Sequence, residues 1–192
     1  MSDISVMTEI TEKKKPLSHS TERFVLQWGD MGHYWGVNRS VSQIHALLYL
    51  SSRPMTADDI AAYLGMARSN VSNSIKELLS WNLIRRVPTR NDRRDHFEAE
   101  TDLWEIFMRI AAGRKEREID PAQAALRACT AEAERDPDID PVAKQRLQEM
   151  LSFVEMLDRW YAQMLAVPKA KLATAIRLGS RIFNLFPAGR KR

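Results

Sequence analysis

The side chains best suited to contact another molecule lie between residues 68 and 76, and they are small polar groups and cations. Asparagine and arginine can hydrogen-bond base edges in the DNA major groove, whereas serine and lysine suit phosphate oxygens. The outward positions of one predicted helix, with Val71, Ile75 and Leu78 facing inward, carry Arg68, Ser69, Asn70, Ser72, Asn73 and Lys76. An ordinary surface helix more often carries Glu–Lys pairs than these helix-poor residues. We therefore predict a recognition helix whose N-terminal turn enters the major groove.

A second group of cations follows in a segment with the pattern of a β-hairpin. Residues 83–88 and 95–100 have extended character, and residues 89–94 have the composition of a turn. The cations of this hairpin that we expect to reach DNA are Arg86, Arg90, Arg93 and Arg94. Arginines on a protruding hairpin can enter a narrow minor groove or hold its phosphates. Asp92 and Asp95 could brace these arginines through ion pairs, and a solvated turn is the alternative interpretation.

The charge of the chain is concentrated in two places. The 192 residues carry a net charge of +4, and one excess lies in residues 68–100, with seven basic and five acidic side chains. Residues 161–192 hold seven basic side chains and no acidic one. Such local basic charge attracts a polyanion, since phosphate neutralisation supplies most non-specific affinity for nucleic acids. Charge alone is equally compatible with an ordinary solvated surface.

Helical periodicity organises the elements around these two segments. Ser40 and Gln43 have the spacing of a capping box, Thr56–Asp59 repeats a helix-start signal, and Gly65 and Asn82 suit left-handed helix ends. The two Asp-Pro pairs, at 120–121 and 140–141, place a capping acceptor before a first-turn proline. The predicted helices cover about 18–36, 40–50, 56–64, 68–81, 102–118, 121–134, 141–166 and 168–186. We therefore expect a mainly α fold with one small β-hairpin.

Two stretches of this sequence resemble a known family. The segments MTADDIAAYLGMARSNVSNSIKELLSWNLIRRV and NDRRDHFEAE are similar to the winged helix-turn-helix of MarR-type bacterial transcription regulators. The flanking segments MGHYWGVNRSVSQIHALLYLSSRPMT and RRDHFEAETDLWEIFMRI resemble the branch related to the glycine betaine synthesis repressor. The resemblance implies a dimeric repressor in which helix 68–81 reads the major groove and wing 84–99 touches the flanking backbone or minor groove. Asn91 stands where glycine is expected in the wing turn, and asparagine tolerates positive φ.

These observations together suggest three parts of the chain. Residues 1–17 are polar and without periodicity, which is typical of a disordered arm. Residues 18–119 are expected to form a winged helix-turn-helix DNA-binding domain, and residues 120–192 a helical region for dimerisation and effector binding.

The last two predicted helices carry apolar stripes that a winged helix of this size cannot cover. The stripe of helix 141–166 includes Leu147, Met150, Leu151, Val154, Leu157, Tyr161 and Leu165. We expect these helices to bury one another and a second copy of the chain, giving a homodimer. The alternative is that residues 161–192, basic and striped with apolar groups, lie on an anionic membrane. No apolar run approaches the roughly 18 residues of a membrane span, and no signal sequence is evident, so we expect a cytoplasmic protein.

Several aromatic side chains could bind a small-molecule effector. Trp28, Trp35, Trp104 and Trp160 could form a cage for a quaternary ammonium ion through cation–π contacts, together with Tyr34 and Phe107. The family resemblance makes choline or a related cation the candidate ligand, and a plain aromatic core is the alternative interpretation.

Catalytic and metal-binding chemistry finds little support in the sequence. No nucleophile stands in a catalytic motif with histidine, the four histidines lack metal-ligand spacing, and we expect neither cofactor nor metal. Cys129 is the only cysteine; we interpret it as a half-buried thiol, with a redox sensor as the alternative. The main competitor to a DNA-binding regulator is a winged-helix module that docks proteins, which would not need the basic charge of helix 68–81 and its hairpin.

Overall fold

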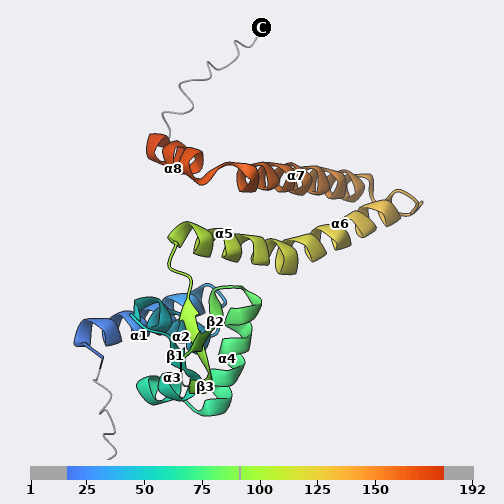
Figure 1. Ribbon diagram of the computed structural model, residues 1–192. Helices are drawn as coiled ribbons and strands as arrows, with labels where there is room; N and C mark the ends of the chain where they lie inside the picture. The colour runs from blue at the N-terminus through green and yellow to red at the C-terminus, as the bar shows by residue number, and fades with distance from the viewer. Residues whose placement is uncertain (1–16, 91, 180–192) are drawn as a thin grey trace, which may run out of the picture. The chain divides into compact units, whose positions relative to one another are not determined.

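The computed structural model describes residues 17–90 and 92–179, which form helices and one small antiparallel sheet (Figure 1). The described residues divide into two compact units, one ending at Thr101 and the other beginning at Asp102. The predicted fold class, mainly α with a small β-hairpin, is confirmed. The predicted disordered arm lies outside the described residues except for Leu17, and so does the predicted end of the last helix.

The core of the first unit forms around α2 (Arg39–Leu50). Eight consecutive residues of this helix, Val41 to Leu48, are buried, because α1 (His19–Tyr34), α4 (Arg68–Ser80) and strand β3 (Asp92–Ala99) all pack against it. The apolar side chains of α2 form the core together with Ile60 of α3 (Ala57–Leu64) and with Val71 and Leu78 of α4. Burial of such side chains stabilises the fold by roughly 1.5–3 kcal/mol each.

Helices α1 and α2 approach each other closely at two glycines of α1. A Cβ atom added at Gly29 would lie 2.5 Å from Cγ of Gln43, and one added at Gly32 would lie 1.9 Å from Oγ and 2.7 Å from Cβ of Ser42. Both of these α2 residues are buried. The absence of a side chain on α1 therefore makes room for polar side chains of α2.

The start of α2 differs from the prediction. The sequence suggested a capping box of Ser40 with Gln43, but the N-cap is Asn38, whose Oδ1 accepts a hydrogen bond from the Ser40 N–H at 2.8 Å. Gln43 cannot reach back to the helix start because it is buried next to Gly29. Asparagine and serine are comparable N-cap residues, so tertiary packing decides which of the two caps the helix.

The helix-turn-helix itself follows the sequence signals. Thr56 and Asp59 form the predicted capping box at the start of α3: the Asp59 N–H donates to Thr56 Oγ1 at 3.1 Å, and the Thr56 N–H donates to the Asp59 carboxylate at 3.2 Å. Gly65 ends α3 in the left-handed region with a φ of 62°. Asn82 follows α4 with a φ of 55°, so both predicted helix ends are confirmed.

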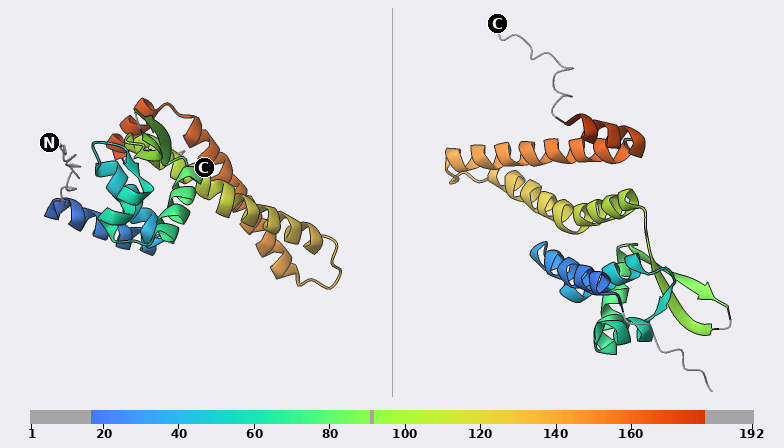
Figure 2. Two further views of the ribbon diagram at one scale, coloured as in Figure 1. Left: turned by 60° about the horizontal axis from the view of Figure 1, so that its bottom comes forward. Right: turned by 90° about the vertical axis from the view of Figure 1, so that its left-hand side faces the viewer.

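The hairpin belongs to a sheet of three antiparallel strands in the order β1-β3-β2. Strand β2 (Ile84–Thr89) pairs with β3, with Ile84 opposite Ala99 and Val87 opposite His96. The two predicted hairpin strands are confirmed within one to three residues. The third strand, β1 (Met55–Thr56), was not predicted from the sequence; it pairs with the other edge of β3 through Phe97 and His96. Figure 2 shows the hairpin extending away from the helices of its unit.

The second unit consists of helices. Its elements are α5 (Leu103–Arg114), a π-helical segment η1 (Lys115–Ile119), α6 (Asp120–Ala133), α7 (Pro141–Ala166) and α8 (Lys169–Leu178). Asp140 caps α7 as predicted, by accepting hydrogen bonds from the N–H groups of residues 142 and 143.

The junction between α5 and α6 differs from the prediction. Asp120 was expected to cap a new helix, but η1 joins α5 to α6 directly, and Asp120 instead pairs with Lys115, five residues earlier. The Lys115 ammonium also pairs with Asp158 of α7 at 2.9 Å, and the two carboxylates raise its pKa. The two compact units divide between Thr101 and Asp102, before α5. The predicted functional boundary at residue 119 stays a prediction.

The glycine contact between α1 and α2 yields a stability prediction. Replacing Gly32 with Ala should destabilise the protein by about 1–3 kcal/mol, because the new methyl group meets the buried side chain of Ser42. Chemical denaturation followed by circular dichroism measures this change. The compensating double variant Gly32→Ala/Ser42→Gly moves the glycine to the other helix and should recover most of the loss. If Gly32→Ala alone is as stable as the natural chain, the close packing of α1 on α2 is wrong.

Candidate nucleic-acid interface

Helix α4 presents its polar side chains to solvent and its apolar side chains to the core. Val71, Ser74, Ile75 and Leu78 are buried. All six side chains predicted to recognise DNA are exposed: Arg68, Ser69, Asn70, Ser72, Asn73 and Lys76. The structure thus places them together on one accessible helix face, as their spacing indicated.

The first turn of α4 is held by two neighbouring helices. Arg68 Nη2 lies 3.0 Å from Asp58 Oδ1 in α3, and Asn70 Nδ2 donates a hydrogen bond to Ser40 Oγ in α2 at 2.9 Å. The N-cap residue is Ala67, which provides no side-chain acceptor. The first N–H groups of a helix have no partner within the helix. An uncapped start of this kind suits contact with an anion such as a phosphate.

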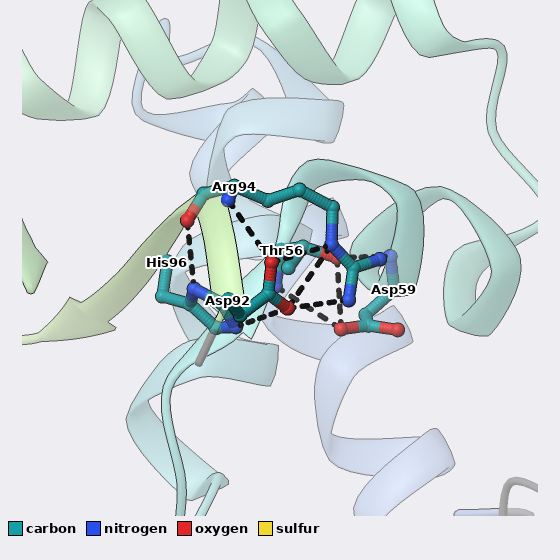
Figure 3. A network of polar contacts seen from close by, with 5 residues as sticks. All are labelled: Thr56, Asp59, Asp92, Arg94 and His96. Atoms are coloured by element: carbon teal, nitrogen blue, oxygen red, sulfur yellow. Dashed lines mark hydrogen bonds and ion pairs between the residues drawn. The ribbon is translucent and has the colours of Figure 1, made fainter. Parts of the chain in front are cut away.

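In the hairpin, carboxylates neutralise three of the arginines. Arg94 binds Asp92 through two nitrogens, with Nη2 2.5 Å and Nε 3.0 Å from carboxylate oxygens (Figure 3). Arg86 Nε lies 3.5 Å from Asp95 Oδ2, and Arg85 Nη2 lies 2.5 Å from Glu98 Oε1. The prediction that Asp92 and Asp95 brace arginines is confirmed.

The contact between Arg94 and Asp92 has the most hydrogen bonds of these pairs. The Arg94 side chain and backbone N–H both donate to Asp92, and they hold the pKa of its carboxyl well below the usual range. Asp92 in turn raises the pKa of Arg94, with smaller contributions from the charges of Asp59 and Asp58. The ring nitrogen Nδ1 of His96, also on β3, lies 2.9 Å from the Arg94 carbonyl oxygen (Figure 3). This network fixes the shape of the wing tip.

Two arginines of the wing have no carboxylate partner in the part of the chain that the structure describes. Arg90 and Arg93 are exposed, and neither has an ion pair within residues 17–90 and 92–179. Arg90 lies in the turn after β2, and Arg93 is the second residue of β3. Of the four predicted wing residues, these two are therefore suited to contact phosphates, whereas Arg86 and Arg94 already have carboxylate partners.

A cleft of about 330 Å³ lies between α4 and the wing. Its lining includes the buried side chains of Ile75 and Phe97. The charged groups that line it are the cations Lys76, Arg86 and Arg94 and the carboxylates Asp58 and Asp95. The hydroxyl of Ser72 also lines this cleft. The cleft thus connects the polar face of α4 with the basic wing into one continuous surface, which we call the basic face.

Two further residues contact the first turn of α4 and were not predicted to do so from the sequence. Ser40 was interpreted as a helix cap, and its contact with Asn70 spans 30 positions of the chain, so no local pattern reveals it. Asp58 was explained by helix capping alone, although its carboxylate also binds Arg68. Its position in the first turn of α3 gave no sign of a partner on the next helix.

The four tryptophans predicted to form an effector pocket fall in both units. In the first unit, Trp28 is half-buried and stacks on Phe24 with ring centroids 5.4 Å apart, and Trp35 is 66% exposed. In the second unit, Trp104 meets Phe107 edge-on and Trp160 is 57% exposed. A pocket that combines all four stays a prediction.

The structure also bears on the predictions for the cysteine, for metal binding and for membrane spans. Cys129 is exposed, not half-buried as the sequence suggested, because it lies on an outer face of α6. Within the part of the chain that the structure describes, no group of three or more histidine, cysteine or acidic side chains could hold a metal ion. None of the described helices is long and apolar enough to cross a membrane.

The sequence of this unit is similar to that of known proteins. Residues 35–95, which contain α2, the helix-turn-helix and most of the wing, match the model of the MarR family. Over these residues the winged helix resembles that of the MarR family. The transcriptional repressor GbsR of Bacillus subtilis (strain 168) is 27% identical over 82% of this chain and 85% of its own length. The repressor OpcR of the same organism is 19% identical over 84% of this chain and 96% of its own.

A solved structure supports the same fold over a longer range. The crystal structure described as a transcriptional regulator superposes with a TM-score of 0.59, covers 76% of this chain and 95% of that one, and is 17% identical. The similarity therefore extends from the MarR-type winged helix into the helical second unit.

Arg90 and Arg93, which have no ion pair among the described residues, lead to a prediction about the salt dependence of DNA binding. Arg93→Ala should weaken binding to duplexes of any sequence, and the slope of log K against log salt should become shallower by about 0.9 for each phosphate that the arginine no longer neutralises. Fluorescence anisotropy at several salt concentrations measures this slope. Arg94→Ala should change the slope less, because Asp92 already neutralises Arg94. Arg135→Ala, an exposed arginine between α6 and α7, controls for the loss of charge. An unchanged slope for Arg93→Ala would remove the wing from the interface.

Proposed function

We propose that this protein is a sequence-specific, double-stranded-DNA-binding regulator of transcription that acts as a homodimeric repressor in the cytoplasm. The proposal rests on the exposed Ser, Asn and Lys side chains of α4, on the basic face that links α4 to the wing, and on Arg90 and Arg93, which have no ion pair among the described residues. This combination suits base edges and phosphates together. We assign the protein no catalytic role.

Repression is supported by the two Bacillus subtilis relatives, both of which are named transcriptional repressors. A repressor of this kind needs only to occupy its DNA site tightly and selectively. The role of recognition helix belongs in this proposal to Arg68, Ser69, Asn70, Ser72, Asn73 and Lys76. The domain roles follow the two compact units, with DNA binding in the first and dimerisation in the second.

Homodimer formation is supported by the surface of α7. This helix has 26 residues, and none of them is buried within the described chain. Its large exposed apolar side chains are Val142, Met150, Phe153, Met156, Leu157 and Trp160. Exposed apolar surface of this extent marks an interaction site, and a second copy provides a matching helix. Two-fold symmetry would then place two recognition helices about 34 Å apart, on successive turns of DNA.

Control by a small molecule completes the proposal. The exposed indoles of Trp35 and Trp160 are groups that bind a quaternary ammonium ion through cation–π contacts. We propose choline or a related cation as the effector. Binding would favour one dimer conformation over the other and so change affinity for DNA.

Selection from a pool of random duplexes at near-physiological salt tests the proposed function. Full-length protein should recover a two-fold symmetric site whose half-sites lie about 10 base pairs apart. Asn73→Ala should then lose about 1–3 kcal/mol of affinity for that site and little for random DNA, because the exposed Asn73 amide would contact a base edge. Ser52→Ala, an exposed loop serine beyond the far end of α2, is the matched control.

Two other outcomes of this selection would be informative. Equal losses on both kinds of DNA would make Asn73 a phosphate contact. Recovery of no sequence, with binding that vanishes as salt rises, would contradict the proposed function and favour a protein-docking module.

Sedimentation equilibrium tests the dimer. At micromolar concentration the natural chain should sediment near twice its mass of 22.1 kDa. Phe153→Asp should shift the equilibrium to monomer, because it buries a charge in the proposed α7 contact. Ser152→Asp adds the same charge about 100° around the helix and should leave the dimer intact. A monomeric natural chain, or a Phe153→Asp variant that remains dimeric, would contradict this interface.

A further inference from the structure

One hydrogen bond connects the recognition helix to the start of α2. The Asn70 amide nitrogen donates to Ser40 Oγ at 2.9 Å, across 30 positions of the chain. Asn70 lies in the first turn of α4, where a recognition helix enters the major groove. Ser40 lies in the first turn of α2. An exposed asparagine of the recognition helix is therefore held by a residue of another helix.

Ser40 is itself held in a rigid environment. Its N–H donates to Oδ1 of the N-cap residue Asn38, and two positions later Ser42 packs into the space beside Gly32 of α1. From Val41 onward the helix is buried. The hydroxyl that receives the Asn70 amide therefore occupies a position that the core of the unit determines.

We propose that Ser40 is a positioning residue for base recognition, which orients the Asn70 amide before DNA binds; this inference rests on the proposed function. A primary amide has two N–H bonds and one acceptor oxygen. With one N–H bound to Ser40, the amide retains one N–H and Oδ1. These two groups form the donor–acceptor pair that matches N7 and the N6 amino group of adenine in the major groove.

The benefit of this contact is conformational. A free asparagine side chain on the helix surface samples several rotamers, and ordering it on binding costs free energy. It can also turn its amide over and present the opposite pair of groups. Asn73, one turn later on the same face, has no hydrogen-bond partner among the residues that the structure describes. The two asparagines thus allow a comparison of an oriented amide with a free one.

Sequence selection with single-hydroxyl variants tests the proposal. Ser40→Ala should lose preference at one base pair of each half-site, an A·T pair, by about tenfold, which corresponds to about 1.4 kcal/mol. Asn70→Ala should lose preference at the same base pair. Both variants remove the same hydrogen bond, so the double variant should lose little more preference than either single variant. Ser40→Thr, which keeps a hydroxyl at this position, should retain the preference.

The controls separate positioning from a structural role. The salt slope and affinity for random DNA should be the same for Ser40→Ala and the natural chain, and thermal unfolding should show a folded protein. Asn70→Ala breaks the same contact from the exposed side of α4 and should show the same loss if Ser40→Ala does not fold. Asn73→Ala should alter a different base pair.

Two results would overturn the inference alone. One is a Ser40→Ala variant that selects the natural sequence with undiminished preference at every position. The other is a uniform loss of affinity for all sequences, which would make Ser40 a structural residue or a phosphate contact. A natural chain that selects no sequence would instead overturn the proposed function, and this inference with it.

Discussion

The burial of α2 is the constraint on which the rest of the first unit depends. Helices α1 and α4 and strand β3 all pack against it, so that even Ser42, Gln43 and His45 are buried. Burial lowers the pKa of His45 to about 4, which keeps its ring neutral at physiological pH. A helix enclosed in this way cannot shift without disturbing several neighbours. The N-terminal turn of α4, hydrogen-bonded to Ser40 at the exposed start of α2, is therefore fixed relative to the core.

The wing combines cations with carboxylates for a physical reason. A hairpin with five free arginines would bind any polyanion strongly, because phosphate contacts do not depend on sequence. Asp92, Asp95 and Glu98 neutralise three of the arginines and give the hairpin a defined shape. Arg90 and Arg93 remain for phosphates, so base contacts from α4 can contribute a larger share of the affinity. The acidic residues of the wing thus favour selectivity over affinity.

Local signals predicted most of this architecture, and long-range packing explains the differences. Gly65 and Asn82 ended their helices as expected, because positive φ is a property of the residue itself. Ser40 resembled a cap from sequence, yet Asn38 caps α2, since both residue types suit that position and the contact with Asn70 is invisible locally. Asp120 resembled a helix start, but Lys115 binds it across a π-helical turn and the helix continues. Strand β1 has only two residues and depends on β3 as its partner, so no periodicity could reveal it.

Helix α4 and the wing together form the surface that we propose binds DNA. Amide hydrogen exchange of the full-length protein, with and without duplex DNA at low salt, measures this most directly. On DNA binding, protection should increase most in the first turns of α4, at the start of α2 and in the hairpin formed by β2 and β3. Protection confined to other elements, or none at a DNA concentration that saturates the protein, would contradict it.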